Sequence, residues 1–220
     1  MGWVVALLWR TAQPSIDDLD KGIKEKGQTD LILLDFSKAF DKVSHRLLLH
    51  KLEHYGVRGT TLLWVKDFLR QRTQQVLIDG EVSTQADVTS GVPQGSVLGP
   101  LLFLAFINDL PDCVKSSTSR LFADDCGVYK RITSPRDAAL LQEDLDALQK
   151  RERKWLMEFH PSKSQVVCIT NKRKPTSSTY SIHGLILEEV HSAKYLKLNV
   201  DKKLSFNTHV DITTKKANSI

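Results

Sequence analysis

Three aspartates in this chain of 220 residues stand where carboxylates are unusual, beside runs of apolar residues. Asp35 directly follows the apolar run Leu31–Leu34, and Asp124 and Asp125 lie between two short apolar segments. A carboxylate next to buried strands is unfavourable unless it is paired or binds a cation. Mg²⁺ prefers hard oxygen ligands and usually takes one or two carboxylates together with substrate phosphates. Two such ions about 3.5–4 Å apart can activate an attacking hydroxyl and stabilise a leaving pyrophosphate.

Aspartate is also common in tight turns, so the Asp-Asp pair by itself fits plain turn chemistry. The surrounding motifs favour the catalytic interpretation. Asp35 lies in Leu33–Val43, a Pro-Gln-Gly motif lies in Ser90–Pro100, and the Asp pair ends Leu121–Asp125. In this order the three segments resemble the catalytic motifs of reverse transcriptases, in the form common in non-LTR retrotransposons of the LINE and jockey-like kind.

Two later segments extend this resemblance. Trp155–Thr170 and Ala193–Leu196 are similar to the later palm motifs of the family, so the likeness covers about residues 28 to 217. The resemblance implies template-directed DNA synthesis, in which a primer 3′-hydroxyl attacks the α-phosphorus of a dNTP. The partners that the resemblance implies are an RNA template, a DNA primer and dNTP. Another palm-fold nucleotidyltransferase, such as a cyclase, is disfavoured by the Pro-Gln-Gly motif.

The resemblance implies a catalytic role for five matched residues. Asp35 and Asp124 would bind two Mg²⁺ ions, for which Mn²⁺ could substitute, with Asp125 as a further acid and the Phe36 carbonyl nearby. Lys163 falls in the segment where such polymerases place a basic residue near the leaving pyrophosphate. A solvated lysine is the alternative for Lys163.

Three further residues are matched to substrate binding. Phe40 would be the steric gate that excludes the 2′-hydroxyl of a ribonucleotide. Gln94 and Gly95 would line the nucleotide and template pocket, where glycine permits close approach of the backbone. Without the family, Phe40 is interpreted as a core aromatic residue and the Pro-Gln-Gly motif as an ordinary loop.

Charge is unevenly distributed along the chain. The net charge is +5, and the part from Arg151 onward is basic whereas the part before it is slightly acidic. An excess of Lys and Arg favours a partner that carries phosphates, although a solvated lysine-rich surface is the alternative. The exposed loop expected over residues 171–178 makes Lys172, Arg173 and Lys174 the candidate phosphate contacts.

Hydrophobic periodicity predicts the elements that position these groups. The run Leu31–Leu34 predicts a strand buried on both faces, and Val76–Ile78 before Asp79-Gly80 predicts a hairpin. Helices are expected from Ser44 to near Gly56, from Thr60 to near Arg70, from Leu101 to near Leu110 and from Ser134 to near Phe159. Further strands are expected at 120–123, 126–129, 165–170 and between 179 and 200. Helices and strands do not strictly alternate, which favours an α+β fold.

The predicted fold is a small antiparallel sheet that carries the acids on one face and is backed by these four helices. Under the resemblance this is the palm of a right-hand polymerase, with fingers and thumb largely missing. Residues 1–27 are weakly patterned and do not match the fingers segments that hold the triphosphate, so we expect an N-terminal remnant before a palm-like domain over residues 28–217. Lys197 stands where the family usually has glycine. These departures favour a truncated element copy or an incomplete gene model, and the alternative function is an inactive relic that at most binds nucleic acid.

Cysteine use and the N-terminal sequence indicate an intracellular protein. The three cysteines form no CxxC pair, which argues against a secreted disulfide scaffold. The apolar run Trp3–Trp9 is far shorter than the ~20 residues of a membrane span and lacks the flanks of a signal peptide. We therefore expect the cytoplasm or the nucleus, without a membrane partner.

Overall fold

The computed structural model describes residues 14–196, 198–205 and 207–218 of the chain. The chain divides into two compact units. Unit 1 contains the residues up to Phe36, Leu110–Glu152 and Glu158–Ile220, and unit 2 contains Ser37–Asp109 and Arg153–Met157. The atypical Lys197 lies outside the described residues, as do residues 1–13 of the expected N-terminal remnant. None of the helices in the described part combines the length and apolar character needed to cross a bilayer.

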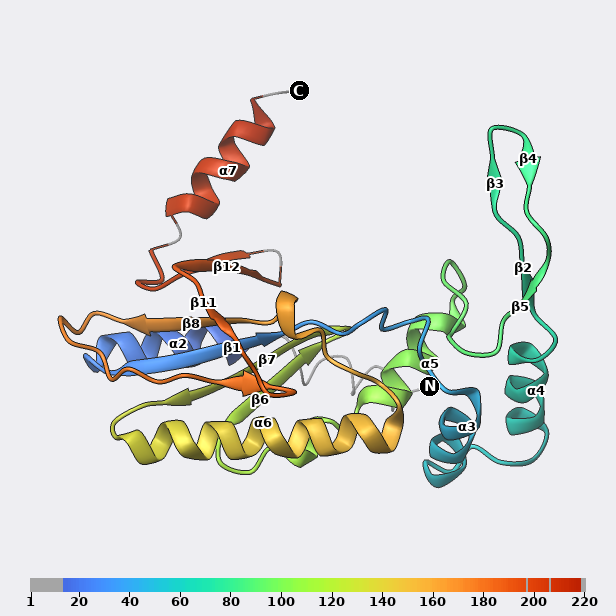
Figure 1. Ribbon diagram of the computed structural model, residues 1–220, viewed down its shortest axis with the longest axis horizontal. Helices are drawn as coiled ribbons and strands as arrows, with labels where there is room; N and C mark the ends of the chain where they lie inside the picture. The colour runs from blue at the N-terminus through green and yellow to red at the C-terminus, as the bar shows by residue number, and fades with distance from the viewer. Residues whose placement is uncertain (1–13, 197, 206, 219–220) are drawn as a thin grey trace. The chain divides into compact units, whose positions relative to one another are not determined.

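Unit 1 is built on a five-stranded sheet in the order β11-β8-β1-β7-β6 (Figure 1). The strands are β1 (Gln28–Leu34), β6 (Thr118–Phe122), β7 (Asp125–Arg131), β8 (Gln165–Thr170) and β11 (Glu188–Glu189). Neighbouring strands are antiparallel except β11, which runs parallel to β8. Every residue of β1 is buried, as its continuous apolar run predicts for a central strand.

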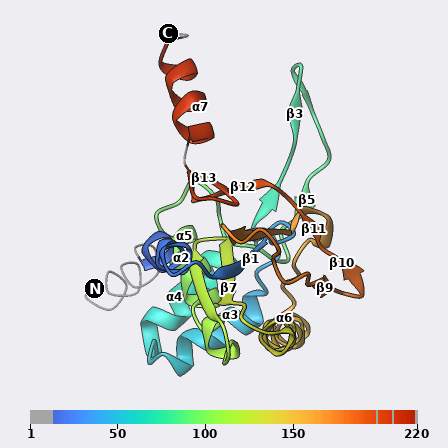
Figure 2. The ribbon, with the colours of Figure 1, turned by 90° about the vertical axis from the view of Figure 1, so that its left-hand side faces the viewer.

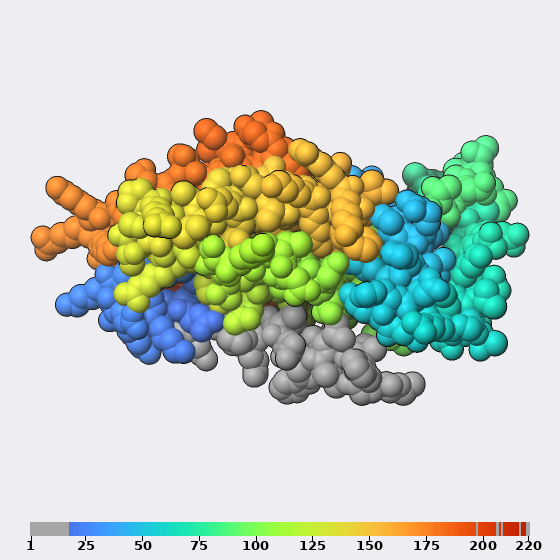
Figure 3. All heavy atoms as spheres, turned by 90° about the horizontal axis from the view of Figure 1, so that it is seen from below, coloured from blue at the N-terminus to red at the C-terminus, as the bar shows by residue number. Residues whose placement is uncertain are grey.

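Both faces of this sheet are covered. On one face, Leu19 of α2 (Pro14–Lys24) packs with Leu31, Leu33 and Tyr129. The two-stranded β12 (Ser192–Tyr195) and β13 (Leu198–Asp201) add Tyr195 and further apolar residues to the same cluster. Helix α6 (Pro135–Trp155) lies on the other side of the sheet from α2 (Figure 2). Seen from below, its yellow atoms form a long band across unit 1 beside the green segment that precedes β6 (Figure 3).

Helix α6 begins where the sequence predicts and ends earlier. Asp137 accepts hydrogen bonds from the backbone N–H groups of Thr133 and Ser134, both at 2.9 Å, and so caps the first turn. The helix ends at Trp155 rather than near Phe159, because Leu156 adopts a left-handed conformation with φ 56°. Phe159 instead forms an antiparallel β-bridge with Phe36.

Helix α2 lies in the segment that the sequence analysis interprets as weakly patterned. Leu19 is fully buried on it and Ile23 packs against the same cluster. In the sequence Ile16, Leu19 and Ile23 have the spacing of one helix face, and this short amphipathic pattern was the signal for α2. The remaining described elements of unit 1 are short or peripheral: η1 (Pro111–Cys113), η2 (Pro161–Lys163), β9 (Ser181–Ile182), β10 (Leu185–Ile186) and α7 (Asn207–Ala217).

Unit 2 contains three helices, α3 (His45–His54), α4 (Gly59–Leu69) and α5 (Leu98–Ile107), among its described residues. Ser44 caps α3 and accepts a hydrogen bond from the Leu47 N–H, as predicted. Helix α5 begins at Leu98 rather than Leu101, because proline is tolerated in the first turn of a helix. Helix α3 packs against both α4 and α5. Three of the four helices that the sequence predicts to back the sheet thus belong to unit 2, whereas α6 up to Glu152 belongs to unit 1 with the sheet.

A two-stranded arm follows α4 (Figure 1). It is made of β2 (Thr73–Gln74) paired with β5 (Ala86–Asp87) and β3 (Leu77–Ile78) paired with β4 (Glu81–Val82). Asp79 and Gly80 both have positive φ values, 50° and 86°, as a tight turn of this kind requires. The predicted hairpin is confirmed, and its residues are exposed.

Candidate active site

The sheet of unit 1 brings three aspartates to one of its ends. Asp35 is the first residue after β1, Asp124 lies in the turn between β6 and β7, and Asp125 is the first residue of β7. In the β1–β7 pair Leu34 lies opposite Cys126, so the exit of β1 is beside the start of β7. Ala123 turns the chain with φ 53°, and Phe122 pairs with Asp125 across the turn.

The three carboxylates interact electrostatically. Burial raises the pKa of the Asp125 carboxyl, and repulsion from Asp124 and Asp35 raises it further. The positive charge of the Lys194 ammonium lowers the pKa of the Asp125 carboxyl and so partly offsets this rise. Gathering like charges in one place disfavours their ionised forms, so this end of the sheet is suited to a cationic ligand.

Asp35 is held by the segment that precedes β8. The Asp35 carbonyl accepts a hydrogen bond from the His160 N–H at 2.7 Å, and the Asp35 N–H donates to Ser164 Oγ at 3.3 Å. The rings of Phe36 and Phe159 stack at 4.4 Å between centroids. This segment places Lys163 Nζ 3.6 Å from Asp35 Oδ2, with the two side chains 64% and 43% exposed. The pair is therefore open to solvent and to a substrate.

The sequence identified the motif that contains Lys194 without assigning this residue a role. Ala193 and Tyr195 of β12 are buried and Lys194 is exposed, which is the alternation of a strand with one covered face. Tyr195 packs against Gly127, two residues after Asp125. Strand alternation within the motif was the signal that could have drawn attention to Lys194.

The donor set at this end of the sheet suits a hard cation. Its side-chain donors are carboxylate oxygens, which Mg²⁺ prefers. In the described residues, however, no three His, Cys, Asp or Glu side chains are close enough to form a metal-binding group by themselves. Mg²⁺ often takes one or two protein carboxylates and completes its shell with water and substrate phosphates, so the residues present fit such an ion.

The other matched residues lie in unit 2. The Phe40 ring is half-buried and stacks on Phe103 at 4.4 Å between centroids. Gln94 Nε2 donates to Asp41 Oδ1 at 3.1 Å, and Gly95 follows with φ 80°. Ser44 caps the helix that follows Asp41, which leaves the Asp41 carboxylate to accept this bond from Gln94.

A polar cavity of about 560 Å³ lies beside the Pro-Gln-Gly loop in unit 2. Gln94, Asp41, Lys38 and Arg72 are among the residues that line it. Gly91 is required in its wall, because a Cβ at this position would come within 2.8 Å of the Asp41 carbonyl oxygen. The loop is thus tightly seated on the segment that follows β1.

Lys172, Arg173 and Lys174 are exposed after the end of β8. In the β1–β8 pair Gln28 lies opposite Thr170 and Leu33 opposite Gln165. The basic triplet therefore follows the end of the sheet that is opposite to Asp35, and the structure does not bring it to the three aspartates.

Comparisons with known proteins identify the family. Residues 4–200 match the family model described as reverse transcriptase (RNA-dependent DNA polymerase). This match begins earlier than the resemblance expected from residue 28 and includes α2.

Three relatives from Drosophila melanogaster cover most of the chain. It is 31% identical over 208 residues to a probable RNA-directed DNA polymerase from transposon BS, with 87% of this chain and 22% of the relative covered. It is 34% identical to the RNA-directed DNA polymerase from mobile element jockey, with 80% of this chain and 20% of the relative covered. It is also 34% identical to a probable RNA-directed DNA polymerase from transposon X-element, with 84% of this chain and 21% of the relative covered. The chain thus spans about a fifth of the length of these relatives.

A solved structure supports the fold. The apo telomerase from Candida tropicalis truncated from its C-terminal domain superposes with a TM-score of 0.55 at 10% identity and covers 91% of this chain and 37% of that one. The α+β, polymerase-like fold predicted from the sequence is confirmed. The chain belongs to the reverse transcriptase (RNA-dependent DNA polymerase) family.

Proposed function

We propose that this chain is the catalytic palm region of a non-LTR retrotransposon reverse transcriptase and carries out RNA-directed DNA synthesis. The observation that carries this proposal is the meeting of Asp35, Asp124 and Asp125 at one end of the sheet. In the reaction a primer 3′-oxygen bonds to the α-phosphorus of a dNTP, and the bond from that phosphorus to the departing pyrophosphate breaks.

The carboxylates of Asp35 and Asp124, with the Phe36 carbonyl, would hold the divalent cations. Bound Mg²⁺, or Mn²⁺ in its place, would supply Lewis-acid activation of the primer hydroxyl and charge stabilisation of the leaving pyrophosphate. Asp125 adds to the negative field that attracts these cations. Phosphoryl transfer depends mainly on positioning and charge stabilisation, and the hydrogen bonds that fix Asp35 serve the first of these.

Lys163 is proposed to donate a proton to the leaving pyrophosphate. Its ammonium is close to Asp35 and exposed, so it can turn from the carboxylate to an incoming phosphate. A general acid placed in this way commonly contributes about 10²- to 10⁴-fold in rate.

In unit 2, Phe40 is proposed as the steric gate against the ribose 2′-hydroxyl. Gln94 and Gly95 are proposed to contact the nucleotide and the template, since Gln94 lines a polar cavity and Gly95 leaves the backbone accessible. Lys172, Arg173 and Lys174 are proposed contacts for nucleic-acid phosphates further from the reacting groups. The proposed setting is inside the cell, in the cytoplasm or the nucleus.

Primer extension tests this proposal. The chain is incubated with a DNA primer on an RNA template, dNTPs and Mg²⁺, and Asp124→Asn is compared with Asp112→Asn, which changes an exposed aspartate of η1 in the same unit. We expect extension to fall about 100-fold or more in Asp124→Asn and to remain in Asp112→Asn. Equal extension by Asp124→Asn and the unsubstituted chain would contradict the assignment. Binding of primer–template without any extension would favour the inactive, nucleic-acid-binding alternative.

A further inference from the structure

Glu152 is a buried acidic residue of unit 1 that lies outside the motifs recognised in the sequence. It belongs to the last turns of α6, and its side chain is only 4% exposed. Taking a carboxylate out of water is unfavourable unless hydrogen bonds compensate for the loss. The groups that bind this carboxylate therefore indicate its role in the fold.

One oxygen of Glu152 binds the backbone of the segment between α6 and β8. Glu152 Oε1 accepts a hydrogen bond from the Phe159 N–H. Phe159 is bridged to Phe36, and the hydrogen bond of this bridge runs from the His160 N–H to the Asp35 carbonyl. In an antiparallel pair of this kind the N–H of the bridged residue itself points away from the partner strand. The buried Phe159 N–H therefore depends on Glu152 for its acceptor.

The other oxygen of Glu152 binds the turn between β9 and β10. Glu152 Oε2 lies 2.7 Å from Nε2 of His183, a side chain that is partly exposed. Burial raises the pKa of the Glu152 carboxyl, and the hydrogen bonds from Phe159 and His183 oppose this rise. Both oxygens are thus engaged, one by the segment beside the candidate active site and one by a surface turn.

The segment that Glu152 binds is also the segment that holds Asp35. Asp35 lies one residue beyond β1, so the pairing of β1 with β7 and β8 does not fix it. Its carbonyl and its N–H are bound instead by His160 and Ser164. In the same segment, η2 places Lys163 Nζ 3.6 Å from Asp35 Oδ2. A displacement of this segment would therefore move two of the candidate catalytic side chains together.

We propose that Glu152 is a positioning residue of the candidate active site. By accepting the hydrogen bond from the Phe159 N–H, it fixes residues 159–164 against the exit of β1 and so places the Asp35 carboxylate and the Lys163 ammonium. Phosphoryl transfer depends mainly on such placement. The effect of Glu152 on catalysis rests on the proposed polymerase function, whereas its effect on the position of Asp35 does not.

Three variants separate this role from the fastening of the surface turn. Glu152→Met fills a similar volume and offers no acceptor to the Phe159 N–H. Glu152→Gln keeps a side-chain carbonyl oxygen that can accept the same hydrogen bond. His183→Ala removes the contact with the turn and leaves the bond from the Phe159 N–H in place.

Asp144→Leu is the matched control for a loss of stability. Asp144 is another buried acidic residue of α6. Its two oxygens accept hydrogen bonds from the backbone N–H groups of Lys115 at 2.8 Å and Ser116 at 3.0 Å. Asp144→Leu and Glu152→Met thus both replace a buried carboxylate by an apolar side chain and remove two hydrogen bonds.

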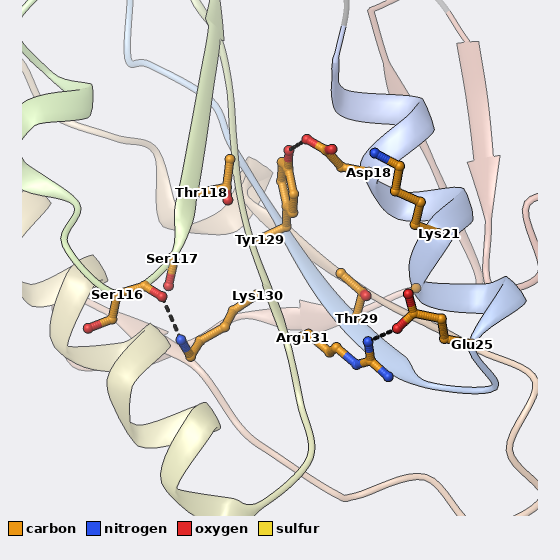
Figure 4. Close-up of a pocket in the computed structure, with 11 residues that line it drawn as sticks. Asp18, Lys21, Glu25, Thr29, Ser116, Ser117, Thr118, Tyr129, Lys130 and Arg131 are labelled. Carbon is orange, nitrogen blue, oxygen red and sulfur yellow. Dashed lines mark hydrogen bonds and ion pairs between the residues drawn. The ribbon is translucent and has the colours of Figure 1, made fainter.

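The backbone that Asp144 binds is distant from the candidate active site. Ser116 lies on the wall of a polar cavity in unit 1, where its carbonyl accepts a hydrogen bond from Lys130 Nζ (Figure 4). Lys130 pairs with Asp30 of β1, and Asp30 is separated from Asp35 by about 17 Å at the usual rise of a strand. Asp144→Leu should therefore lower stability without moving Asp35.

Amide hydrogen exchange, followed by NMR, tests the position of the segment without metal or substrate. We expect the Phe159 and His160 amides to exchange at least about tenfold faster in Glu152→Met than in Asp144→Leu, because a hydrogen bond to a charged group is lost. Exchange should stay slow in Glu152→Gln and His183→Ala. Equal exchange in Glu152→Met and Asp144→Leu would overturn the proposal. Fast exchange in Glu152→Gln or His183→Ala would overturn it too, even if Glu152→Met does not fold.

The Mg²⁺ dependence of primer extension connects this position to catalysis. The Mg²⁺ concentration that gives half-maximal extension should rise about tenfold in Glu152→Met, remain unchanged in Asp144→Leu and be restored in Glu152→Gln. Fast exchange with an unchanged Mg²⁺ dependence would make Glu152 a structural residue only and overturn its link to catalysis. No extension by the unsubstituted chain would contradict the proposed function instead, and the exchange experiment would still decide whether Glu152 positions Asp35.

Discussion

Tyr195 lies so close to Gly127 that a Cβ on the glycine would come within 2.9 Å of Tyr195 Oη. The contact joins β12 to the central sheet next to the turn that carries Asp125. It also explains why Lys194, the neighbour of Tyr195, acts on the Asp125 carboxyl. Gly127 of β7 and Tyr195 of β12, although far apart in the sequence, therefore pack together beside the candidate active site.

Gly127→Ala tests this contact. The added methyl group meets the Tyr195 ring, and overpacking of a filled core typically destabilises a protein by about 1–3 kcal/mol. Urea denaturation measures the change in the free energy of unfolding. In a Tyr195→Ala background the same substitution should be much less harmful, because the ring is absent. Equal effects in both backgrounds would show that the two residues are not coupled.

Divalent cations should stabilise the folded chain. Mg²⁺ or Mn²⁺ relieves the repulsion among Asp35, Asp124 and Asp125 and, by binding the folded state, raises the melting temperature. Differential scanning calorimetry with and without the metal measures the shift. Asp124→Asn should lose most of it, whereas Asp112→Asn should retain it. An unaltered metal response in Asp124→Asn would place the cation elsewhere.

Phe40→Val tests the proposed steric gate. If the ring excludes the ribose 2′-hydroxyl, the preference for dNTP over rNTP in primer extension should fall by a factor of 10 to about 1,000. Because the ring also stacks on Phe103, the substitution is expected to lower stability, which is measured in parallel. Phe40→Tyr keeps the ring and should keep the selectivity. A loss of stability with unchanged selectivity would assign Phe40 to core packing.

The buried Asp30 should make stability depend on pH. Burial raises the pKa of its carboxyl, although hydrogen bonds from Tyr180, Gln28 and Cys168 oppose that effect. The folded chain therefore holds the Asp30 proton more tightly than the unfolded chain, in which the pKa of an aspartate is about 3.9. The resulting stabilisation is fully present below that pH and is lost as pH rises through the folded-state pKa.

Asp30→Asn removes this titration and keeps an acceptor for the Tyr180 hydroxyl, which donates to Asp30 Oδ2 at 2.7 Å. Denaturation curves between about pH 4 and pH 7 should show a free energy of unfolding that falls with pH more steeply in the unsubstituted chain than in the variant. Parallel pH profiles for the two proteins would contradict the prediction.

The elements that carry the candidate site were predictable from local sequence patterns. The apolar run before Asp35 and the two runs around Asp124 and Asp125 fit buried strands best, and β1, β6 and β7 follow them closely. Ser44, the Asp79-Gly80 turn and Asp137 fixed local ends and turns, because capping and positive φ are properties of a few neighbouring residues. The order of the motifs was likewise sufficient to indicate the family.

The neighbours of each candidate residue could be identified only from the folded chain. Strand register brings Asp35 beside the β6–β7 turn and sends Lys172, Arg173 and Lys174 to the other end of the sheet. The assignment of α3, α4 and α5 to a second unit, the packing of α2 on the sheet and the contact of Tyr195 with Gly127 also emerged only in three dimensions. Local propensity specifies a helix or a strand from its own residues, whereas register and packing depend on side chains that are distant in the sequence and become neighbours when the chain folds.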